Sequence, residues 1–173
     1  MAVDVINRHG RLRVDRRAIA RHIGAMLDAL KRPGAVVDVS LVGDPEIREL
    51  NLRYRGVDAV TDVLSFALAD DDGPPGPQDL LGDIVISLDT ARRQADEIAA
   101  ALAEAHGAAA KAYRMRQETL LLATHGLLHL LGYDHQSQDE AERMESLERR
   151  FMASVTDLPV HDFDRSDHGL SVP

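Results

Sequence analysis

The 173-residue chain contains no cysteine and no tryptophan, and only three phenylalanines and three tyrosines. Without cysteine it can form neither a disulfide framework nor a thiolate metal site, which fits a reducing compartment. With so few aromatic rings, base-stacking platforms can hardly dominate any contact with nucleic acid. No apolar run approaches the roughly 20 residues that a membrane span needs, and no signal peptide is visible at the N-terminus. We therefore expect a cytoplasmic protein with no membrane partner.

The formal net charge of −9 argues against broad, nonspecific binding to polyanions, and we expect no DNA partner. The charge is distributed unevenly: residues 1–60 hold 11 basic and 8 acidic side chains, while residues 61–173 hold 9 and 21. A local basic face built from the first third of the chain could still meet phosphate. Charge alone favours the simpler interpretation that the arginines in this first third of the chain form the solvated side of a helix.

The hydrophobic pattern alternates between strand and helix periodicity along one domain of ordinary size. It predicts strands at 3–7, 35–42, 62–68 and 83–88, and helices from Asp15 to about 30, from Asp44 onward, at 90–106, from after Gly107 to the histidine run at 125–135, and at 139–152. The second of these helices carries Ile47, Leu50 and Tyr54. The order predicts an α+β fold with a small mixed four-stranded sheet covered by helices. We expect a single catalytic domain over 1–156, an exposed loop at 70–77 and a mobile tail over 157–173.

Three histidines, His125, His129 and His135, are spaced so that they could close around one metal ion. Residues i and i+4 of a helix lie on one face, so His125 and His129 can turn their imidazoles toward the same point. Gly132 suits a left-handed helix end, because glycine lacks the Cβ that makes this conformation costly. The chain can then fold back and deliver His135 as a third nitrogen ligand.

The run is close to the H-E-x-x-H-x-x-G-x-x-H pattern of the metzincin zinc proteases, so we expect a metzincin-like core with the metal site on a central helix and the turn after it. Gly126 stands where those proteases have the glutamate that takes a proton from the metal-bound water. A three-histidine zinc site leaves a fourth position for water, whose pKa zinc can lower to roughly 7. Hydrolysis remains possible if another base or the substrate accepts the proton. One Zn²⁺ per chain is preferred, although nickel or another divalent ion suits the same donors.

Two further residues are candidates for chemistry. Arg55 ends the second predicted helix, where a guanidinium could bind two phosphate oxygens; composition alone favours the simpler interpretation that it complements the helix dipole. Asp134 could support an imidazole or act as the base, or it could cap the next helix. Asp62 and Glu148 are weaker candidates for the base, and Met144 is most simply core filling.

Three blocks carry a resemblance to a known family: 51–55 with 61–66, 81–87, and 124–135 with Met144 and Glu148. Over about residues 3–152 the chain resembles the YbeY family of bacterial ribosomal-RNA maturation factors, described as metal-dependent endoribonucleases. The departures are modest: Val60 and Ala67 stand where the family often has prolines.

The resemblance implies zinc bound by His125, His129 and His135, and an arginine at Arg55 that is needed for function. It also implies cleavage of single-stranded RNA, processing of the 3′ end of 16S rRNA, a role in ribosome quality control, and the small ribosomal subunit and its associated factors as partners. Attack by the substrate's own 2′-hydroxyl would reduce the need for the missing glutamate. Two alternatives remain open: a ribosome-assembly factor that binds RNA or protein, uses zinc to hold its shape and has little turnover, and a peptidase.

Overall fold

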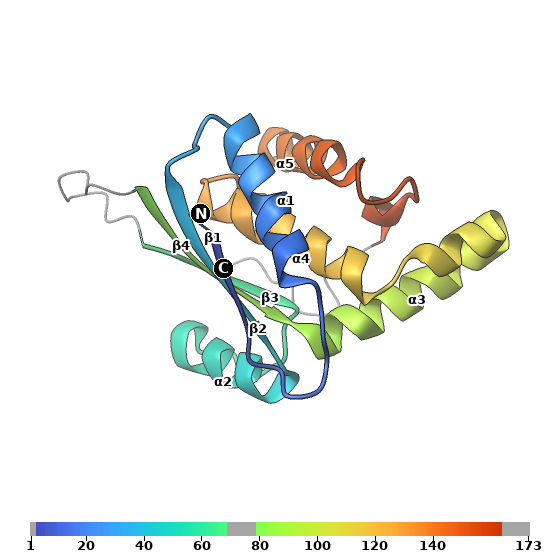
Figure 1. Ribbon diagram of the computed structural model, residues 1–173, viewed down its shortest axis with the longest axis horizontal. Helices are drawn as coiled ribbons and strands as arrows, with labels where there is room; N and C mark the ends of the chain where they lie inside the picture. The colour runs from blue at the N-terminus through green and yellow to red at the C-terminus, as the bar shows by residue number, and fades with distance from the viewer. Residues whose placement is uncertain (1–2, 69–78, 164–173) are drawn as a thin grey trace.

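The computed structural model describes residues 3–68 and 79–163, with the backbone alone at 79 and 111. A four-stranded sheet forms the central layer: α1, α3, α4 and α5 pack on one side, and α2 lies on the other (Figure 1). The strands are β1 (Val3–Asn7), β2 (Ala35–Val42), β3 (Val63–Ala67) and β4 (Asp79–Ser87). The helices are α1 (Arg16–Ala29), α2 (Asp44–Arg55), α3 (Leu88–His106), α4 (Met115–Leu130) and α5 (Gln138–Met152), with 3-10 turns at Gly107–Ala112 and Val160–Asp162.

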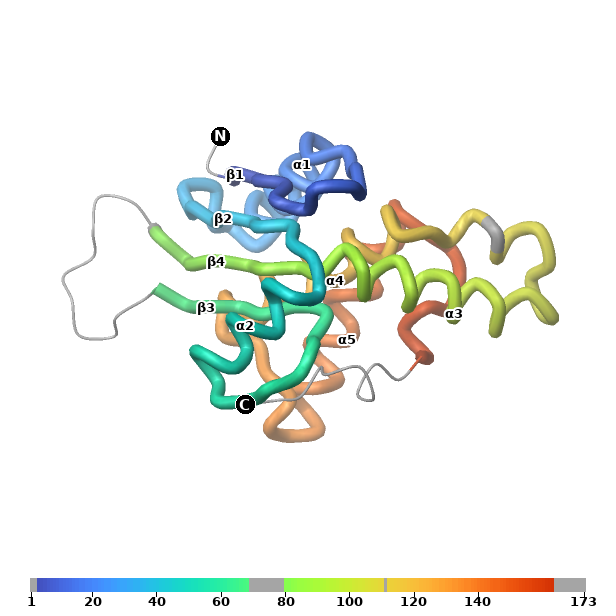
Figure 2. Tube along the Cα trace, turned by 90° about the horizontal axis from the view of Figure 1, so that it is seen from below, coloured from blue at the N-terminus to red at the C-terminus, as the bar shows by residue number. Residues whose placement is uncertain are grey.

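The strand order is β1-β2-β4-β3, which makes β3 an edge strand. β1, β2 and β4 run parallel, and β3 pairs antiparallel to β4 with Ser65 opposite Ile84. Figure 2 shows the strands side by side with α2 near β3. The predicted α+β fold with a small mixed four-stranded sheet is confirmed.

The two faces of the sheet are covered unequally. The main core lies between the sheet and α1, α3, α4 and α5, and it includes the fully buried Ile23, Leu122 and Met144. A small second cluster under α2 holds Val42, Ile47, Leu64 and Val85. Tyr54 does not join this cluster: its side chain is 62% exposed at the end of α2. Within the described residues, α2 therefore covers only part of this side of the sheet.

The last strand differs from the predicted one at both ends. β4 begins at Asp79 rather than at residue 83, because pairing with β2 continues through a register shift at Val36/Val37. It ends at Ser87, whose Oγ accepts a hydrogen bond from Thr90 N at 3.3 Å and caps α3. Leu88 is therefore the first residue of the helix.

The C-terminal segment packs on the body as far as the structure describes it. Val160 is fully buried, and Leu158 and Phe163 pack against the main core. Residues 164–173, the rest of the predicted mobile tail, lie outside the described residues, as does the predicted loop at 70–77. Among the described helices, none combines the length and the apolar character that a membrane crossing requires.

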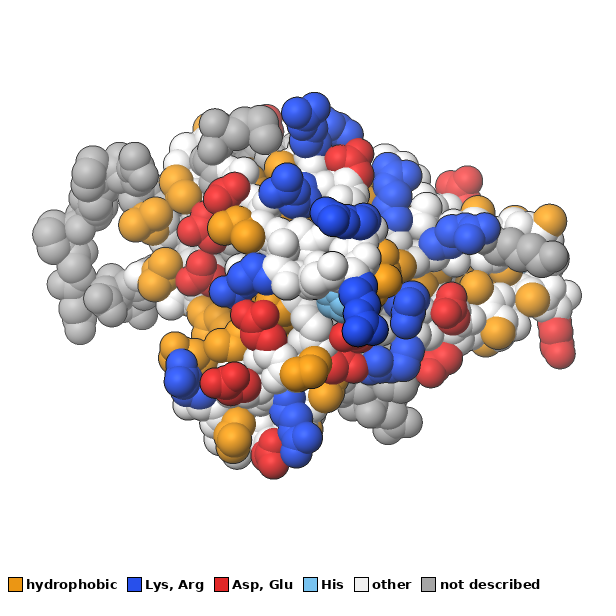
Figure 3. Space-filling view, turned by 60° about the horizontal axis from the view of Figure 1, so that its bottom comes forward, with side chains coloured by type: hydrophobic (Ala, Val, Ile, Leu, Met, Phe, Trp, Pro, Cys, Tyr) orange, Lys and Arg blue, Asp and Glu red, His pale blue; other side chains and the backbone are white. Residues whose placement is uncertain are grey.

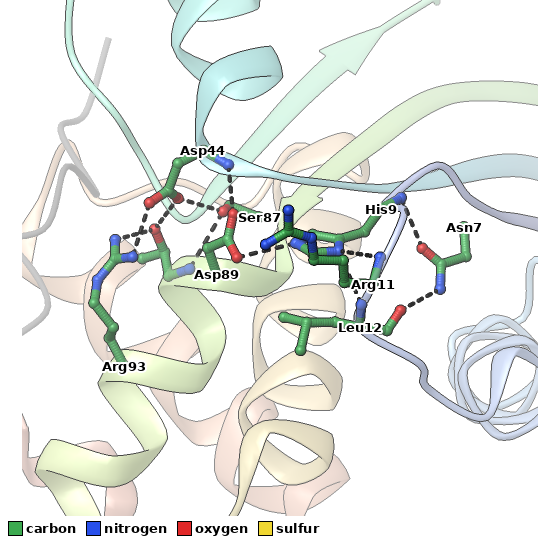
Figure 4. Close-up of polar contacts among 9 residues, drawn as sticks. Asn7, His9, Arg11, Leu12, Asp44, Ser87, Asp89 and Arg93 are labelled. Atoms are coloured by element: carbon green, nitrogen blue, oxygen red, sulfur yellow. Dashed lines mark hydrogen bonds and ion pairs between the residues drawn. The ribbon is translucent and has the colours of Figure 1, made fainter.

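A polar network ties together the ends of the parallel strands (Figure 4). Asp44, the first residue of α2, accepts hydrogen bonds from Ser87 Oγ at 2.6 Å and Arg93 Nη1 at 2.8 Å. Its backbone N–H donates to Asp89 Oδ2 at 3.0 Å, and His9 Nε2 binds the other oxygen of Asp89 at 2.9 Å. Burial alone raises the pKa of Asp44, but its hydrogen bonds from Ser87, Arg93 and Thr90 outweigh burial and lower it. The network fixes the start of α2 against α3.

Candidate metal centre

Helix α4 is almost entirely buried and is anchored on both sides. On the sheet side, Ser65 Oγ of β3 donates to the carbonyl of Gly126 at 3.2 Å. On the α1 side, His22 Nε2 lies 2.8 Å from Thr124 Oγ1, which in turn donates to the carbonyl of Leu120. Burial lowers the pKa of His22, so its neutral form is favoured. These contacts bracket His125 and hold the histidine-bearing turn in place.

The third histidine is delivered by the turn after α4. Gly132 has φ = +90°, in the region that favours glycine, as the sequence predicts. Its N–H donates to the carbonyl of His129 at 3.0 Å, and Tyr133 N donates to the carbonyl of Leu128 at 3.0 Å. This left-handed helix end reverses the chain and brings His135 beside His125 and His129.

The three histidines converge on one point. Each offers one ring nitrogen, and these atoms all lie within 4.8 Å of one another. The Nε2 atoms of His125 and His129 are 2.9 Å apart, and the rings of His125 and His135 stack with centroids at 5.4 Å. Zinc–nitrogen bonds of about 2.0–2.1 Å place tetrahedral ligand atoms about 3.3 Å apart. This separation is close to the 2.9 Å between the Nε2 atoms of His125 and His129 and lies within the 4.8 Å limit for the three nitrogens. The donor set therefore fits a small divalent cation with affinity for imidazole.

Glu148 of α5 orients the first of these histidines. Its Oε1 accepts a hydrogen bond from His125 Nδ1, which places the ring proton there and leaves the Nε2 lone pair free. Burial alone would raise the pKa of Glu148, but the hydrogen bond and the neighbouring imidazoles of His125, His161 and His135 hold it below its usual value. Glu148 therefore stands as a carboxylate behind His125.

The electrostatic environment favours uncharged imidazole at His129. Burial, followed by the nearby His125 and His135, lowers the pKa of His129 to about 4. At neutral pH one ring nitrogen of His129 therefore keeps an available lone pair, while the other carries the proton. Neutral imidazole is the form that binds a metal ion.

Gly126 faces the sheet and has no room for a side chain. A Cβ built there would lie 2.8 Å from Ile84 Cγ2 and 3.2 Å from Ser65 Oγ. Ile84 is fully buried, so it cannot move aside into solvent. Helix-on-sheet packing thus favours glycine at this position, because any side chain, a glutamate included, would force Ile84 or its surroundings to shift. Because the metzincin proteases use a glutamate at this position as the base, this packing disfavours the peptidase alternative.

The comparisons with known proteins agree on one family. The sequence profile described as "Endoribonuclease YbeY" matches residues 4–156. The chain belongs to the YbeY family. Curated relatives named endoribonuclease YbeY include one from Moorella thermoacetica, 47% identical over 70% of this chain and 73% of its own length, and one from Pelotomaculum thermopropionicum, 39% identical over 90% and 97%.

A solved structure shares the YbeY fold of this chain. The solution structure of TM1509 from Thermotoga maritima matches 94% of this chain and 97% of its own, with a TM-score of 0.56 and 24% sequence identity. This likeness supports the architecture alone.

Asp134 and Arg55, the other two predicted site residues of this YbeY chain, lie in different structural environments. Asp134 is next to the histidines, but its Oδ1 accepts from the backbone N–H of His135 at 2.7 Å, so it stabilises the turn. Arg55 ends α2 and is exposed; within residues 3–68 and 79–163 no ion pair or hydrogen bond to its side chain is found. Catalytic roles for both residues stay predictions.

The sequence does not predict the contact of Glu148 with His125 and indicates Glu148 only as a weak candidate for the base. A signal was present: Glu148 lies one helical turn after Met144, a core position, on an otherwise highly charged helix. Asp62, the other weak candidate, is fully buried, and its carboxylate accepts from Gln94 Nε2 and Val63 N. Burial raises the pKa of Asp62.

We expect Glu148→Gln to weaken metal binding by about 10- to 100-fold, the usual effect of losing a carboxylate that orients a histidine ligand. An amide can present its NH₂ to His125 Nδ1 and so favour the wrong tautomer. Competition with a chromophoric chelator measures the change. Glu145→Gln on the same helix, which removes only a surface pair with Arg149, is the control. Equal affinity in both variants would contradict an orienting role for Glu148.

We expect Gly126→Ala to destabilise the metal-free protein by about 1–2 kcal/mol, because overpacking costs about 1–3 kcal/mol and the gain in helix propensity returns at most about 1. Gly24→Ala is the matched control: Gly24 is also helical, but nothing lies within 4 Å of its added Cβ. Urea unfolding should show Gly24→Ala equal to or more stable than the wild type. Gly126→Ala as stable as Gly24→Ala would show that β4 yields easily.

Proposed function

We propose that this chain is a metal-dependent endoribonuclease that cleaves single-stranded RNA. The observation that carries the proposal is the convergence of His125, His129 and His135, with Glu148 behind the first of them. The curated relatives named endoribonuclease YbeY support the choice of RNA as the substrate.

The chain supplies a preorganised nitrogen donor set. The hydrogen bond to Glu148 presents Nε2 of His125, burial keeps His129 neutral, and the turn at Gly132 holds His135 in place. When bound, one zinc ion would polarise a phosphate oxygen and lower the pKa of a coordinated water to about 7. Another divalent ion that prefers imidazole would suit the same donors.

Arg55 and Asp134 have separate roles in this proposal. Arg55, exposed and without an ion-pair partner in the described part of the chain, binds nonbridging phosphate oxygens and stabilises the charge that develops on them. Asp134 lies beside His135 and has a second carboxylate oxygen that can accept the proton of the nucleophile. If the RNA's own 2′-hydroxyl is the nucleophile, Asp134 takes its proton instead.

Membership of the YbeY family supports a proposal for the cellular role. We propose that the substrate is ribosomal RNA, that the chain processes the 3′ end of 16S rRNA, and that it acts in ribosome quality control in the cytoplasm. The small ribosomal subunit and its associated factors are then its partners.

The test is cleavage of a labelled single-stranded RNA and of the same sequence as a duplex. The protein is compared as purified, after removal of metal by a chelator, and after zinc is restored. The proposal predicts cleavage of the single strand only, lost with the metal and regained with zinc. Products ending in a 2′,3′-cyclic phosphate would indicate attack by the 2′-hydroxyl, and 3′-hydroxyl ends would indicate attack by water. Cleavage that survives full metal removal would overturn the proposal.

A second candidate is a ribosome-assembly factor that uses zinc to hold its shape and binds RNA or protein with little hydrolysis. It is favoured by Gly126, which excludes the glutamate base, and by the engagement of Asp134 Oδ1 with the backbone. Zinc-loaded protein that binds single-stranded RNA and leaves it intact would establish this candidate in place of the nuclease.

A further inference from the structure

One aromatic side chain is displayed on the surface next to basic residues. Tyr54 is the only aromatic among the exposed large hydrophobic side chains of residues 3–68 and 79–163. Its ring meets Phe66 of β3 edge to face, with centroids 5.2 Å apart and planes at 63°. Such a pair is a favourable geometry for two rings and limits the motion of the exposed one. Tyr54 is therefore a supported ring with an open face rather than a loose surface side chain.

Positive charge flanks this ring. Arg53 and Arg55 are its neighbours in the last turn of α2, both exposed. Figure 3, which brings the α2 side forward, shows basic, acidic and hydrophobic side chains interspersed on this face. A flat ring next to guanidinium groups is the combination that binds single-stranded nucleic acid, with the base on the ring and the phosphate on the arginine.

A short series of contacts connects the ring to the histidines. Phe66 follows Ser65, whose Oγ donates to Gly126 beside His125. Consecutive residues of a strand point to opposite faces, so Ser65 faces α4 while Phe66 faces Tyr54. Among the described strands, β3 pairs on its β4 side alone, so an RNA chain that passes over its other edge would run from one face of the sheet to the other.

Acidic residues restrict the path that an RNA backbone can take past Tyr54 and Phe66. Asp83 is in register with Phe66 and Asp38, and Asp38 is in register with Asp4, so three carboxylates form a row across the open face of the sheet. Burial and the neighbouring Asp38 raise the pKa of Asp83. Phosphate is repelled from this side of the aromatic pair. The exposed Arg53 and Arg55, in the last turn of α2, are the groups near Tyr54 that attract an RNA backbone.

We propose that Tyr54, supported by Phe66, stacks against one base of single-stranded RNA a short distance along the chain from the cleaved bond. The inference rests on the proposed function and adds a subsite to it. A duplex keeps its bases stacked inside, so this subsite would favour single strands. The subsite consists of one exposed aromatic ring and is not an extended base-stacking surface, which agrees with the scarcity of aromatic residues in the chain.

Binding is measured with metal-free protein, so that the RNA stays intact, by anisotropy of a labelled single-stranded oligonucleotide. Tyr54→Leu, which keeps bulk and removes the ring, should weaken binding about 5- to 100-fold. Tyr54→Phe should stay within about twofold of the wild type, as should Leu52→Ala, a control exposed on the same helix. With the metal restored, Tyr54→Leu should raise KM and leave kcat nearly unchanged.

A set of RNAs, each lacking one base, locates the contact. At the stacked position, base removal should weaken the wild type but have no added effect on Tyr54→Leu. Two results would overturn the inference while leaving the nuclease intact: normal RNA binding by Tyr54→Leu, or an equal loss in Tyr54→Phe, which would assign the effect to the hydroxyl. Wild-type protein that neither binds nor cleaves single-stranded RNA would overturn the proposed function as well.

Discussion

His129→Ala should leave the folded protein without tightly bound metal. We expect its metal affinity to lie at least about 100-fold below that of the wild type, because losing a ligand costs more than losing a residue that only orients a ligand, which costs about 10- to 100-fold. His129 is central to the cluster: its Nε2 lies 2.9 Å from that of His125, and its ring is edge-on to that of His135. Two imidazoles cannot hold the ion tightly. Elemental analysis after dialysis and a competition titration measure the loss.

The matched control is His106→Ala, which removes an exposed histidine at the end of α3. Alanine favours helix at position 129, so a change in circular dichroism is not expected. Full metal occupancy in His129→Ala after dialysis would contradict the three-histidine site.

Arg55→Ala should retain metal and fold while RNA cleavage falls by about 10²- to 10³-fold, the usual effect of removing one group that stabilises developing charge. The side chain is exposed at the end of α2, so the core is not disturbed. The loss should appear mainly in kcat, because the charge on the phosphate oxygens changes during the reaction.

Arg53→Ala separates this effect from general attraction of RNA. Arg53 is an exposed arginine in the same helical turn, and its loss should raise KM by less than about tenfold with little change in kcat. Lysine at position 55 should restore only part of the activity, because an ammonium group lacks the two-pronged geometry. Normal cleavage by Arg55→Ala would remove this residue from the catalytic machinery.

The order of elements could be predicted from the sequence because it depends on local signals: period-two and period-3.6 patterns, Asp15 as a helix cap, Pro45 early in α2, and Gly132 at a left-handed helix end. The i, i+4 spacing of His125 and His129 likewise fixes their shared face without knowledge of the tertiary fold. The early start of β4 could not be predicted, since it depends on pairing with β2.

The functions of several single residues also depend on contacts between distant segments. The sequence alone indicates a lost catalytic base at Gly126, whereas the close approach of Ile84 of β4 gives a packing reason for glycine. Glu148 is 23 positions from His125 in the sequence, and only the packing of α5 on α4 joins them. Tyr54 has the spacing of a core residue, yet α2 covers too little of the sheet to bury it.

The most direct measurement is cleavage of one single-stranded RNA by wild type, His129→Ala and Arg55→Ala, purified in the same way and assayed with and without a chelator. A metal-dependent endoribonuclease with this site predicts activity in the metal-loaded wild type alone, with at most about 1% in Arg55→Ala. Equal activity in every sample would reveal a contaminating nuclease. No activity in the zinc-loaded wild type would instead favour the assembly factor.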